Sequence, residues 1–148
     1  MSVLLLDVNV VVAAHRDDHR FYAAAGTWFE ALLEDAAPFA VPMIVWASFL
    51  RLVTNRRIFD PPTPLAAAFA FLEATCAQPQ HLHLNPGHDH LRLLRRVCQE
   101  ANATADLISD AVVAAIALEH GAVVVSLDRD FARFPSIDFL VPGGEAGR

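Results

Sequence analysis

Residues 3–7 read Val3-Leu4-Leu5-Leu6-Asp7, a short apolar run that ends in a carboxylate. A second run near the end of the chain, residues 122–127, has the same form and is followed by Asp128. Continuous apolar runs of this length are typical of strands that are buried on both faces, as in a parallel sheet. The two stretches therefore predict two buried strands of a parallel sheet, with an acidic residue at the carboxyl end of each strand.

The sequence between these runs predicts helices, because apolar residues recur there at intervals of three and four. The expected helices span residues 9–15, 21–33, 43–54, 63–77 and 88–100, and a last one that Asp106 or Ser109 caps and Gly121 ends. In the helix over 43–54, we expect Ile44, Ala47 and Leu50 to face the core, with Phe49 and Val53 as further candidates for the inward face. Short strands over 39–41 and 81–84 complete an alternation that is typical of an α/β domain with a mostly parallel sheet.

Length and composition predict one folded domain. The chain has 148 residues, of which 55% are hydrophobic and 19% charged, and this is enough to bury a single core. Disordered proteins combine low hydrophobicity with high charge, so that class is excluded. We expect a single domain over residues 1–142 and a flexible, glycine-containing tail over residues 143–148.

Cysteine use and hydropathy indicate the cellular setting. Cys76 and Cys98 lie far apart with no C-x-x-C spacing, which argues against a disulfide framework or a zinc ribbon and favours a reducing compartment such as the cytoplasm. The longest uncharged run, residues 36–50, contains two prolines and falls short of the roughly 20 apolar residues that a membrane span needs. We therefore expect no membrane association.

The net charge is acidic, with 17 Asp and Glu residues against 11 basic ones, for a formal charge of −6. All the basic residues are arginine, and the chain has no lysine. Affinity for nucleic acids depends mainly on neutralising phosphates, so an acidic protein is a poor passive binder of RNA or DNA. A function on nucleic acid would require local positive charge that overcomes the global balance.

Four carboxylates are expected to meet at one edge of the sheet. Asp7 and Asp128 follow the two predicted strands, Asp130 comes two residues later, and Asp110 opens a helix whose small residues favour close packing on the sheet. Ligands of open parallel sheets bind at the carboxyl ends of the strands. Carboxylates gathered there would repel one another, and Mg²⁺ or Mn²⁺, which prefer oxygen ligands, would relieve the repulsion. Such a site can activate water and hold a phosphodiester.

Each of these acids also has a purely structural explanation. Asp106 or Asp110 could cap a helix, and Asp128 and Asp130 could form a turn. Asp7 is harder to explain in this way, because aspartate is unfavourable in strands. The arrival of three sequence-distant acids at the same sheet edge makes the metal site the better interpretation.

Arginines near the acids are candidates for binding phosphate. For Arg51 and Arg129, phosphate contact and simple solvent exposure are equally good explanations. For Arg92, Arg95 and Arg96, a solvated helix face is the better explanation, because most charge runs lie on such faces.

Three stretches resemble the PIN-domain ribonucleases: Leu-Leu-Asp-Val-Asn-Val over residues 5–10, Asp-Ala-Val-Val-Ala-Ala-Ile-Ala over 110–117, and Val-Val-Ser-Leu-Asp-Arg-Asp-Phe-Ala-Arg-Phe-Pro over 124–135. More narrowly, the chain resembles the VapC toxins of bacterial type II toxin–antitoxin systems, and residues 47–55 are similar to the mycobacterial-type branch. The resemblance covers nearly the whole chain. Its most specific part is S-x-D-x-D-F-x-x-F-P in company with D-A-x-x-A-A.

The resemblance implies a PIN-like, three-layer α/β/α fold with a central, mostly parallel sheet flanked by helices. It also implies a Mg²⁺- or Mn²⁺-dependent endoribonuclease that acts on tRNA, rRNA or mRNA, a cognate VapB-type antitoxin and a homodimer. The matching positions assign the metal to Asp7, Asp110 and Asp128, and Asp130 matches a further catalytic acid. Asn9 and Ser126 match polar neighbours that orient waters or carboxylates.

The chain departs from the family pattern at one position. Many PIN domains carry a glutamate on the helix after the second strand, whereas residues 46–51 contain no acid and Ser48 occupies that place. The departure argues against a second strongly held metal, and it favours Asp7 and Asp110 as the direct ligands of one ion.

Two alternatives come from other classes of protein. A HAD-type phosphatase also places an aspartate after its first strand, but it needs a second aspartate where this chain has Asn9, and a lysine that this chain lacks. A degenerate PIN module could bind RNA or a partner without cutting. The missing glutamate supports that alternative, and the four remaining acids argue against it.

Overall fold

The computed structural model describes residues 2–144 and 146–147, and the side chains of residues 2–144. Strands and helices alternate along the chain, which confirms the expected α/β class. The elements are β1 (Leu4–Leu6), α1 (Val8–His15), α2 (Tyr22–Glu34), β2 (Phe39–Ala40), α3 (Met43–Val53), α4 (Leu65–Cys76), α5 (His90–Ala101), α6 (Leu107–His120), β3 (Val123–Val125), the 3₁₀ helix η1 (Arg129–Arg133), β4 (Phe139–Leu140) and β5 (Ala146–Gly147).

The sheet has the strand order β2-β1-β3-β4-β5, and its first four strands are parallel. β1 lies at the centre beside β3, with Leu5 opposite both Ala40 of β2 and Val124 of β3. Leu5 and Val124 are fully buried, as expected for central strands that are covered on both faces. Because β1 and β3 are parallel neighbours, their carboxyl ends lie side by side.

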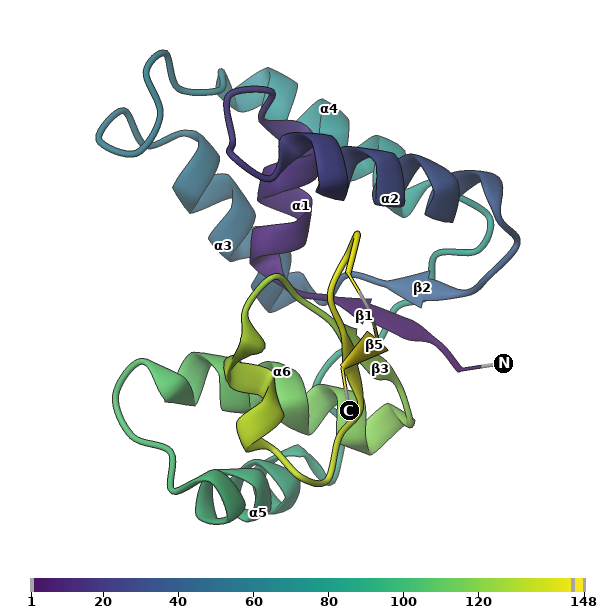
Figure 1. Ribbon diagram of the computed structural model, residues 1–148, viewed down its shortest axis with the longest axis vertical. Coiled ribbons are helices and arrows are strands. Elements are labelled where there is room, and N and C mark those ends of the chain that lie inside the picture. Colours follow the sequence, from purple (N-terminus) through teal and green to yellow (C-terminus); the bar gives the residue numbers. More distant parts are fainter. Residues whose placement is uncertain (1, 145, 148) are drawn as a thin grey trace.

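Helices cover both faces of the sheet, which confirms the three-layer arrangement. Figure 1 shows α1 to α4 on one side of the strands and α5 and α6 on the other. α6 lies closer to the strands, because the side chains along its buried face are mostly alanine and are fully buried. Gly121 ends this helix with a φ of 65°, the left-handed conformation that favours glycine.

The expected inward face of α3 is wrong for two residues. Ile44 is 47% exposed and Ala47 is also exposed, whereas Val45, Trp46, Phe49 and Val53 are buried. The helix is rotated so that its aromatic side chains, which bury the most apolar surface, enter the core. Leu50 is partly buried against the same core, as expected.

Residues 81–84 do not form the expected strand. Only His81 forms an isolated bridge, to Phe39, and it accepts a hydrogen bond from the backbone N–H of Val41 at 3.3 Å. The sheet instead gains β4 and β5, and β5 pairs antiparallel with β4. The predicted tail thus contributes β5 to the sheet. Its residues Glu145 and Arg148 lie outside the described residues, and the flexibility of the tail stays a prediction.

Cys76 and Cys98 are both free. Within the described part of the chain, no helix combines the length and the apolar character that crossing a membrane would need.

Candidate metal centre

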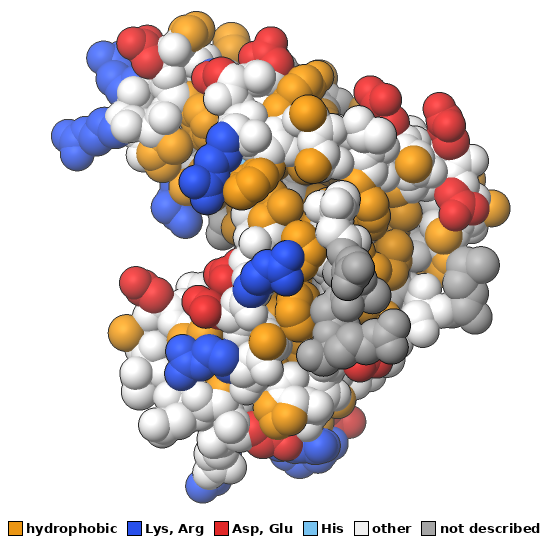
Figure 2. Space-filling view, in the orientation of Figure 1, with side chains coloured by type: hydrophobic (Ala, Val, Ile, Leu, Met, Phe, Trp, Pro, Cys, Tyr) orange, Lys and Arg blue, Asp and Glu red, His pale blue; other side chains and the backbone are white. Residues whose placement is uncertain are grey.

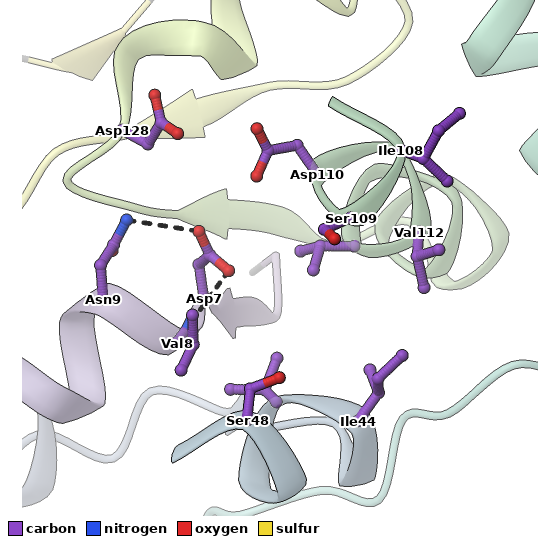
Figure 3. Close-up of a pocket in the computed structure, with 12 residues that line it drawn as sticks. Asp7, Val8, Asn9, Ile44, Ser48, Ile108, Ser109, Asp110, Val112 and Asp128 are labelled. Atoms are coloured by element: carbon purple, nitrogen blue, oxygen red, sulfur yellow. Dashed lines mark hydrogen bonds between the residues drawn. The ribbon is translucent and has the colours of Figure 1, made fainter. Parts of the chain in front are cut away.

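A cavity of about 300 Å³ lies where the ends of β1 and β3 meet the first turns of α1, α3 and α6. Asp7, Asp110 and Asp128 contribute to its lining, together with Asn9 and Ser48. Figure 3 shows the carboxylates of Asp7, Asp110 and Asp128 pointing toward the same space from three different elements. The sheet topology therefore brings together the acids that the sequence places at strand ends and at a helix start.

Asp7 is held in place by several hydrogen bonds (Figure 3). It is the N-cap of α1, and its Oδ1 accepts a hydrogen bond from the N–H of Val8 at 2.8 Å. Its Oδ2 accepts hydrogen bonds from the hydroxyl of Ser126 at 2.9 Å and the amide of Asn9 at 3.4 Å. Asp7 is only 5% exposed, so this carboxylate has little freedom to turn.

Asn9 and Ser126 join the end of β3 to the start of α1. The Ser126 hydroxyl oxygen is buried and accepts hydrogen bonds from the Asn9 amide and from the N–H of Asp128, both at 3.0 Å. The Asn9 side-chain oxygen accepts a hydrogen bond from the N–H of Leu127 at 2.9 Å. These contacts link the backbones that carry Asp7 and Asp128, and the orienting roles of Asn9 and Ser126 stay a prediction.

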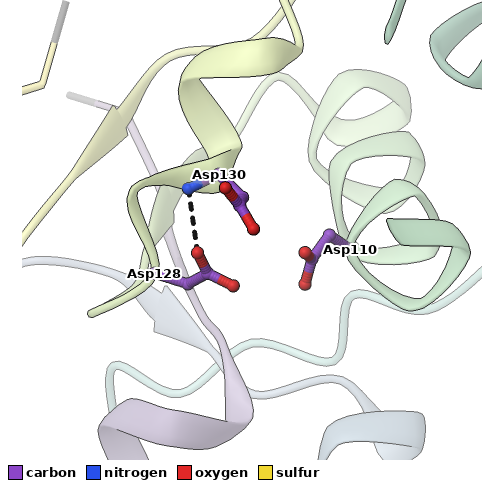
Figure 4. Close-up of side chains that lie close together, drawn as sticks. All are labelled: Asp110, Asp128 and Asp130. Atoms are coloured by element: carbon purple, nitrogen blue, oxygen red, sulfur yellow. Dashed lines mark hydrogen bonds between the residues drawn. The ribbon is translucent and has the colours of Figure 1, made fainter. Parts of the chain in front are cut away.

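Asp110, Asp128 and Asp130 form the tightest acidic group (Figure 4). Each offers one carboxylate oxygen, and these three oxygens lie within 4.8 Å of one another. Asp128 also caps η1, where its Oδ1 accepts a hydrogen bond from the N–H of Asp130 at 2.8 Å. Asp128 therefore forms a turn and also belongs to the acidic group. Asp110 does not cap α6, because the N-cap of that helix is Asp106. Asp7 lines the same cavity but is not part of this group of three.

Burial and mutual repulsion disfavour negative charge at the site. Burial raises the pKa of Asp110 to about 7, with further increases from the charges of Asp7, Asp128 and Asp130. The pKa of Asp7 is also raised, because burial outweighs the hydrogen bonds from Val8 and Ser126. Among the described residues, none of the four acids forms an ion pair with a basic side chain. A set of carboxylate oxygens with no internal counter-charge fits a hard divalent cation.

The raised pKa of Asp110 predicts a pH-dependent instability of the metal-free protein. A carboxyl whose pKa rises from 3.8 to about 7 on folding binds its proton more tightly in the folded state, so stability falls as the pH rises through that range. At pH 7.5 we expect Asp110→Asn to be more stable than the wild type by roughly 1–2 kcal/mol, because solvent screening at this half-buried carboxyl reduces the full effect.

Thermal unfolding in EDTA at pH 4 and pH 7.5 tests this difference. The advantage of Asp110→Asn should nearly vanish at pH 4. His15 and His81, whose pKa values burial lowers, titrate in both proteins and cancel in the comparison. An equal advantage at both pH values would contradict the prediction.

The remaining predicted residues lie in different settings. Ser48 lines the cavity from α3, opposite the acidic residues. Arg51, in the last turn of α3, and Arg129, between two of the clustered acids, are both exposed, and neither lines the cavity.

The cavity also has an apolar half, which the sequence did not predict. A single sequence carries no signal that separates an apolar side chain facing a cavity from one facing the core.

Comparisons with known proteins identify the family of this chain. The PIN-domain family model matches residues 4–137. Ribonuclease VapC31 and ribonuclease VapC25 of Mycobacterium tuberculosis are each 59% identical over 140 residues, which cover 95% of this chain and 99% of each relative. Among solved structures, the VapBC2 complex of Rickettsia felis bound to a promoter DNA fragment contains a chain that matches with a TM-score of 0.70 at 14% identity, covering 95% of this chain and 98% of that one.

A second solved structure is Mycobacterium tuberculosis VapC20, described as a sarcin–ricin loop cleaving toxin. It matches with a TM-score of 0.66 at 13% identity, covering 87% of this chain and 92% of that one. At these identities the two structures support the fold, while the relatives of high identity show the family. The chain therefore belongs to the PIN-domain family and, within it, to the VapC ribonucleases.

Proposed function

We propose that this protein is the toxin of a type II, VapBC-type toxin–antitoxin pair and that it is a Mg²⁺- or Mn²⁺-dependent endoribonuclease. The observation that carries the proposal is the convergence of the acids on one cavity. Asp7, Asp110 and Asp128 line it, and oxygens of Asp110, Asp128 and Asp130 lie within 4.8 Å of one another without an internal counter-charge among the described residues. Its relatives of high identity are named ribonucleases, which supports cleavage as the activity.

Asp7 and Asp110 would hold the ion, with Asp128 and Asp130 aligning the attacking water or the substrate. A divalent ion bound here would lower the pKa of a water molecule and so supply a nucleophile for phosphodiester hydrolysis at neutral pH. Ser126 and Asn9 keep Asp7 turned toward the cavity through the hydrogen bonds described above. Cleavage would leave a 5′-phosphate and a 3′-hydroxyl. Ser48, in place of an acid, favours a single strongly held ion.

The relatives support proposals for the substrate and the partner. We infer cellular RNA (tRNA, rRNA or mRNA) as substrate, with support from the relative described as cleaving the sarcin–ricin loop. A VapB-type antitoxin as inhibitor has support from the VapBC complexes among the similar structures. A homodimer and a cytoplasmic location belong to the same proposal.

Mapping of RNA ends tests the proposed activity. The purified protein, incubated with total bacterial RNA and Mg²⁺, should produce new 5′-phosphate ends at defined sites. EDTA should abolish them, and Asp7→Asn should reduce them at least about 100-fold, because even a residue that only supports a ligand is worth about 10- to 100-fold. RNA binding without cleavage would instead favour a degenerate PIN module. The phosphatase alternative is not favoured, because the PIN family match covers most of the chain.

Arginines near the site should hold phosphates despite the net charge of −6. Figure 2 shows basic side chains on both sides of the hollow in this face of the molecule, close to acidic ones. We expect Arg129→Gln to lower kcat/KM for RNA by about 5-fold, the value of one exposed ion contact of roughly 1 kcal/mol. It should also reduce the slope of log kcat/KM against log salt by about 1.

The matched control is Arg92→Gln. Arg92 lies on α5 and pairs with Asp89 at 3.4 Å, so its substitution should leave both the rate and the salt slope unchanged. Equal effects of Arg129→Gln and Arg92→Gln would show that Arg129 acts only through the net charge of the protein. The variant Arg51→Gln applies the same test to the arginine on α3.

A further inference from the structure

The cavity beside the acidic residues has an apolar half that metal binding does not use. Its apolar lining consists of Val8, Ile44, Val45, Ile108, Val112 and Val113. Two of these side chains are large and open to solvent: Ile44 is 47% exposed and Ile108 is 38% exposed. Exposed aliphatic side chains that gather around a cavity indicate a surface that a ligand covers.

The apolar side chains face one another from two helices on opposite faces of the sheet. Figure 3 shows Ile44 and Ser48 on α3, across the cavity from Ile108 and Val112 on α6. Ser48 lies one turn after Ile44 and therefore shares its face of α3. Ser48 and Ser109 line the same cavity. The walls thus offer apolar contact together with two hydroxyl-bearing side chains.

The charge of the site limits what can enter this half. Asp7, Asp110 and Asp128 line the same cavity, so an anionic group would be repelled from it unless a cation intervened. An RNA substrate has one uncharged, flat part with apolar faces and a polar edge, which is the base. A volume of about 300 Å³ lies at the lower end of small-molecule pockets, which suits a single base and is too small for a base pair with its backbones.

We propose that this cavity binds one unpaired RNA base next to the phosphodiester that is cut, and that Ile44 and Ile108, with the hydroxyls of Ser48 and Ser109, determine which base is accepted. The proposal rests on the proposed ribonuclease function. Enzymes that act on nucleic acids commonly take a base out of the stack and read it by apolar contact and by hydrogen bonds to its edge. Here the two isoleucines would contact the faces of the base, and the serines its edge.

Abasic substitution in a cleaved RNA tests the pocket directly. A random-sequence, single-stranded RNA pool incubated with the wild-type protein and Mg²⁺ identifies a preferred sequence. One oligonucleotide of that sequence is then made with an abasic nucleotide at each position in turn. One position near the cut should show a loss in kcat/KM of about 10- to 100-fold, the range expected when the contacts of one base are lost.

The pocket variants link that position to the named residues. Ile44→Ala and Ile108→Ala should each lower kcat/KM on the intact RNA about 10-fold, since a small apolar deletion in a binding pocket has effects of this size. They should also alter the base preference at that one position. On the abasic RNA their effect should largely disappear, because the two changes remove the same contact. Leu91→Ala, at a 78% exposed position on α5, is the matched control and should change neither rate nor preference.

The possible outcomes distinguish failure of the base-binding proposal from failure of the proposed ribonuclease function. If the wild type cuts RNA but tolerates an abasic nucleotide at every position, the cavity does not bind a base, and the inference is overturned while the ribonuclease function stands. A side chain of a protein partner would then be the better occupant. If Ile44→Ala and Ile108→Ala slow cleavage without changing base preference, although Tm shows both to be folded, they have no role in specificity. If the wild type cuts no RNA at all, both proposals are wrong.

Discussion

Replacing Asp110 with asparagine is expected to lower metal-dependent RNA cleavage by at least about 100-fold, because the substitution of residues that merely support a metal ligand already costs 10- to 100-fold. Asp110, like Asp128, belongs to both parts of the acidic site: it is in the cluster with Asp130, and it lines the cavity with Asp7. An amide at this position keeps the size of the side chain but removes the charge that would bind the cation. The loss should therefore appear as weaker metal binding as well as slower cleavage.

Magnesium titrations measure both effects. In the wild type, Mg²⁺ should raise Tm, because a ligand that binds only the folded state stabilises that state. At a ligand concentration a hundredfold above its Kd, the stabilisation is about 2.7 kcal/mol. Asp110→Asn should lose most of this increase and should not recover cleavage at higher Mg²⁺. The control is Asp106→Asn, on the same helix, because Asp106 is exposed and its side chain makes no capping hydrogen bond. Cleavage by Asp110→Asn at the rate of Asp106→Asn would exclude Asp110 as a ligand.

Replacing Phe49 with alanine is expected to lower the free energy of unfolding by about 3–5 kcal/mol, the cost of removing a fully buried phenylalanine. Phe49 has no exposed surface, and its ring centroid lies 5.3 Å from His15, and 5.4 Å from both Trp46 and Phe71. These rings come from α1, α3 and α4, so the cluster joins three of the helices that cover one face of the sheet. The cavity left by the deletion cannot be filled without moving these helices.

Thermal unfolding gives the size of this effect. A loss of 3–5 kcal/mol corresponds to a decrease in Tm of roughly 10 °C in a protein of this length. Phe69→Ala is the matched control, because Phe69 lies on α4 and is 40% exposed; it should cost less than about 1 kcal/mol. At a temperature where Phe49→Ala is folded, the increase in Tm on adding Mg²⁺ should stay near that of the wild type, since the acids lie on other elements than α3. Equal losses of stability in the two variants would contradict the importance of the cluster.

The face that a helix buries was harder to predict than its position. The helix over 43–54 was expected within one residue of its observed bounds, yet Ile44 and Ala47 were assigned to the wrong face. Several apolar faces are possible in this helix, because most of its residues are apolar, and periodicity alone cannot choose between them. Partners from distant parts of the chain, Phe71 among them, favour the burial of Trp46 and Phe49. The same rotation leaves Ile44 and Ser48 facing the cavity.

The amino-acid sequence was sufficient to predict the α/β class, two buried strands, and the placement of Asp7 and Asp128 at the ends of those strands. These features follow from local patterns: continuous apolar runs form buried strands, and parallel neighbours end at the same edge of the sheet. Three features of the site arise only in the folded chain: Asp110, Asp128 and Asp130 form the tightest group, burial raises the pKa of Asp110 to about 7, and an apolar half adjoins the acids. Distances, burial and cavities depend on contacts between residues far apart in the chain, and local sequence patterns do not contain them.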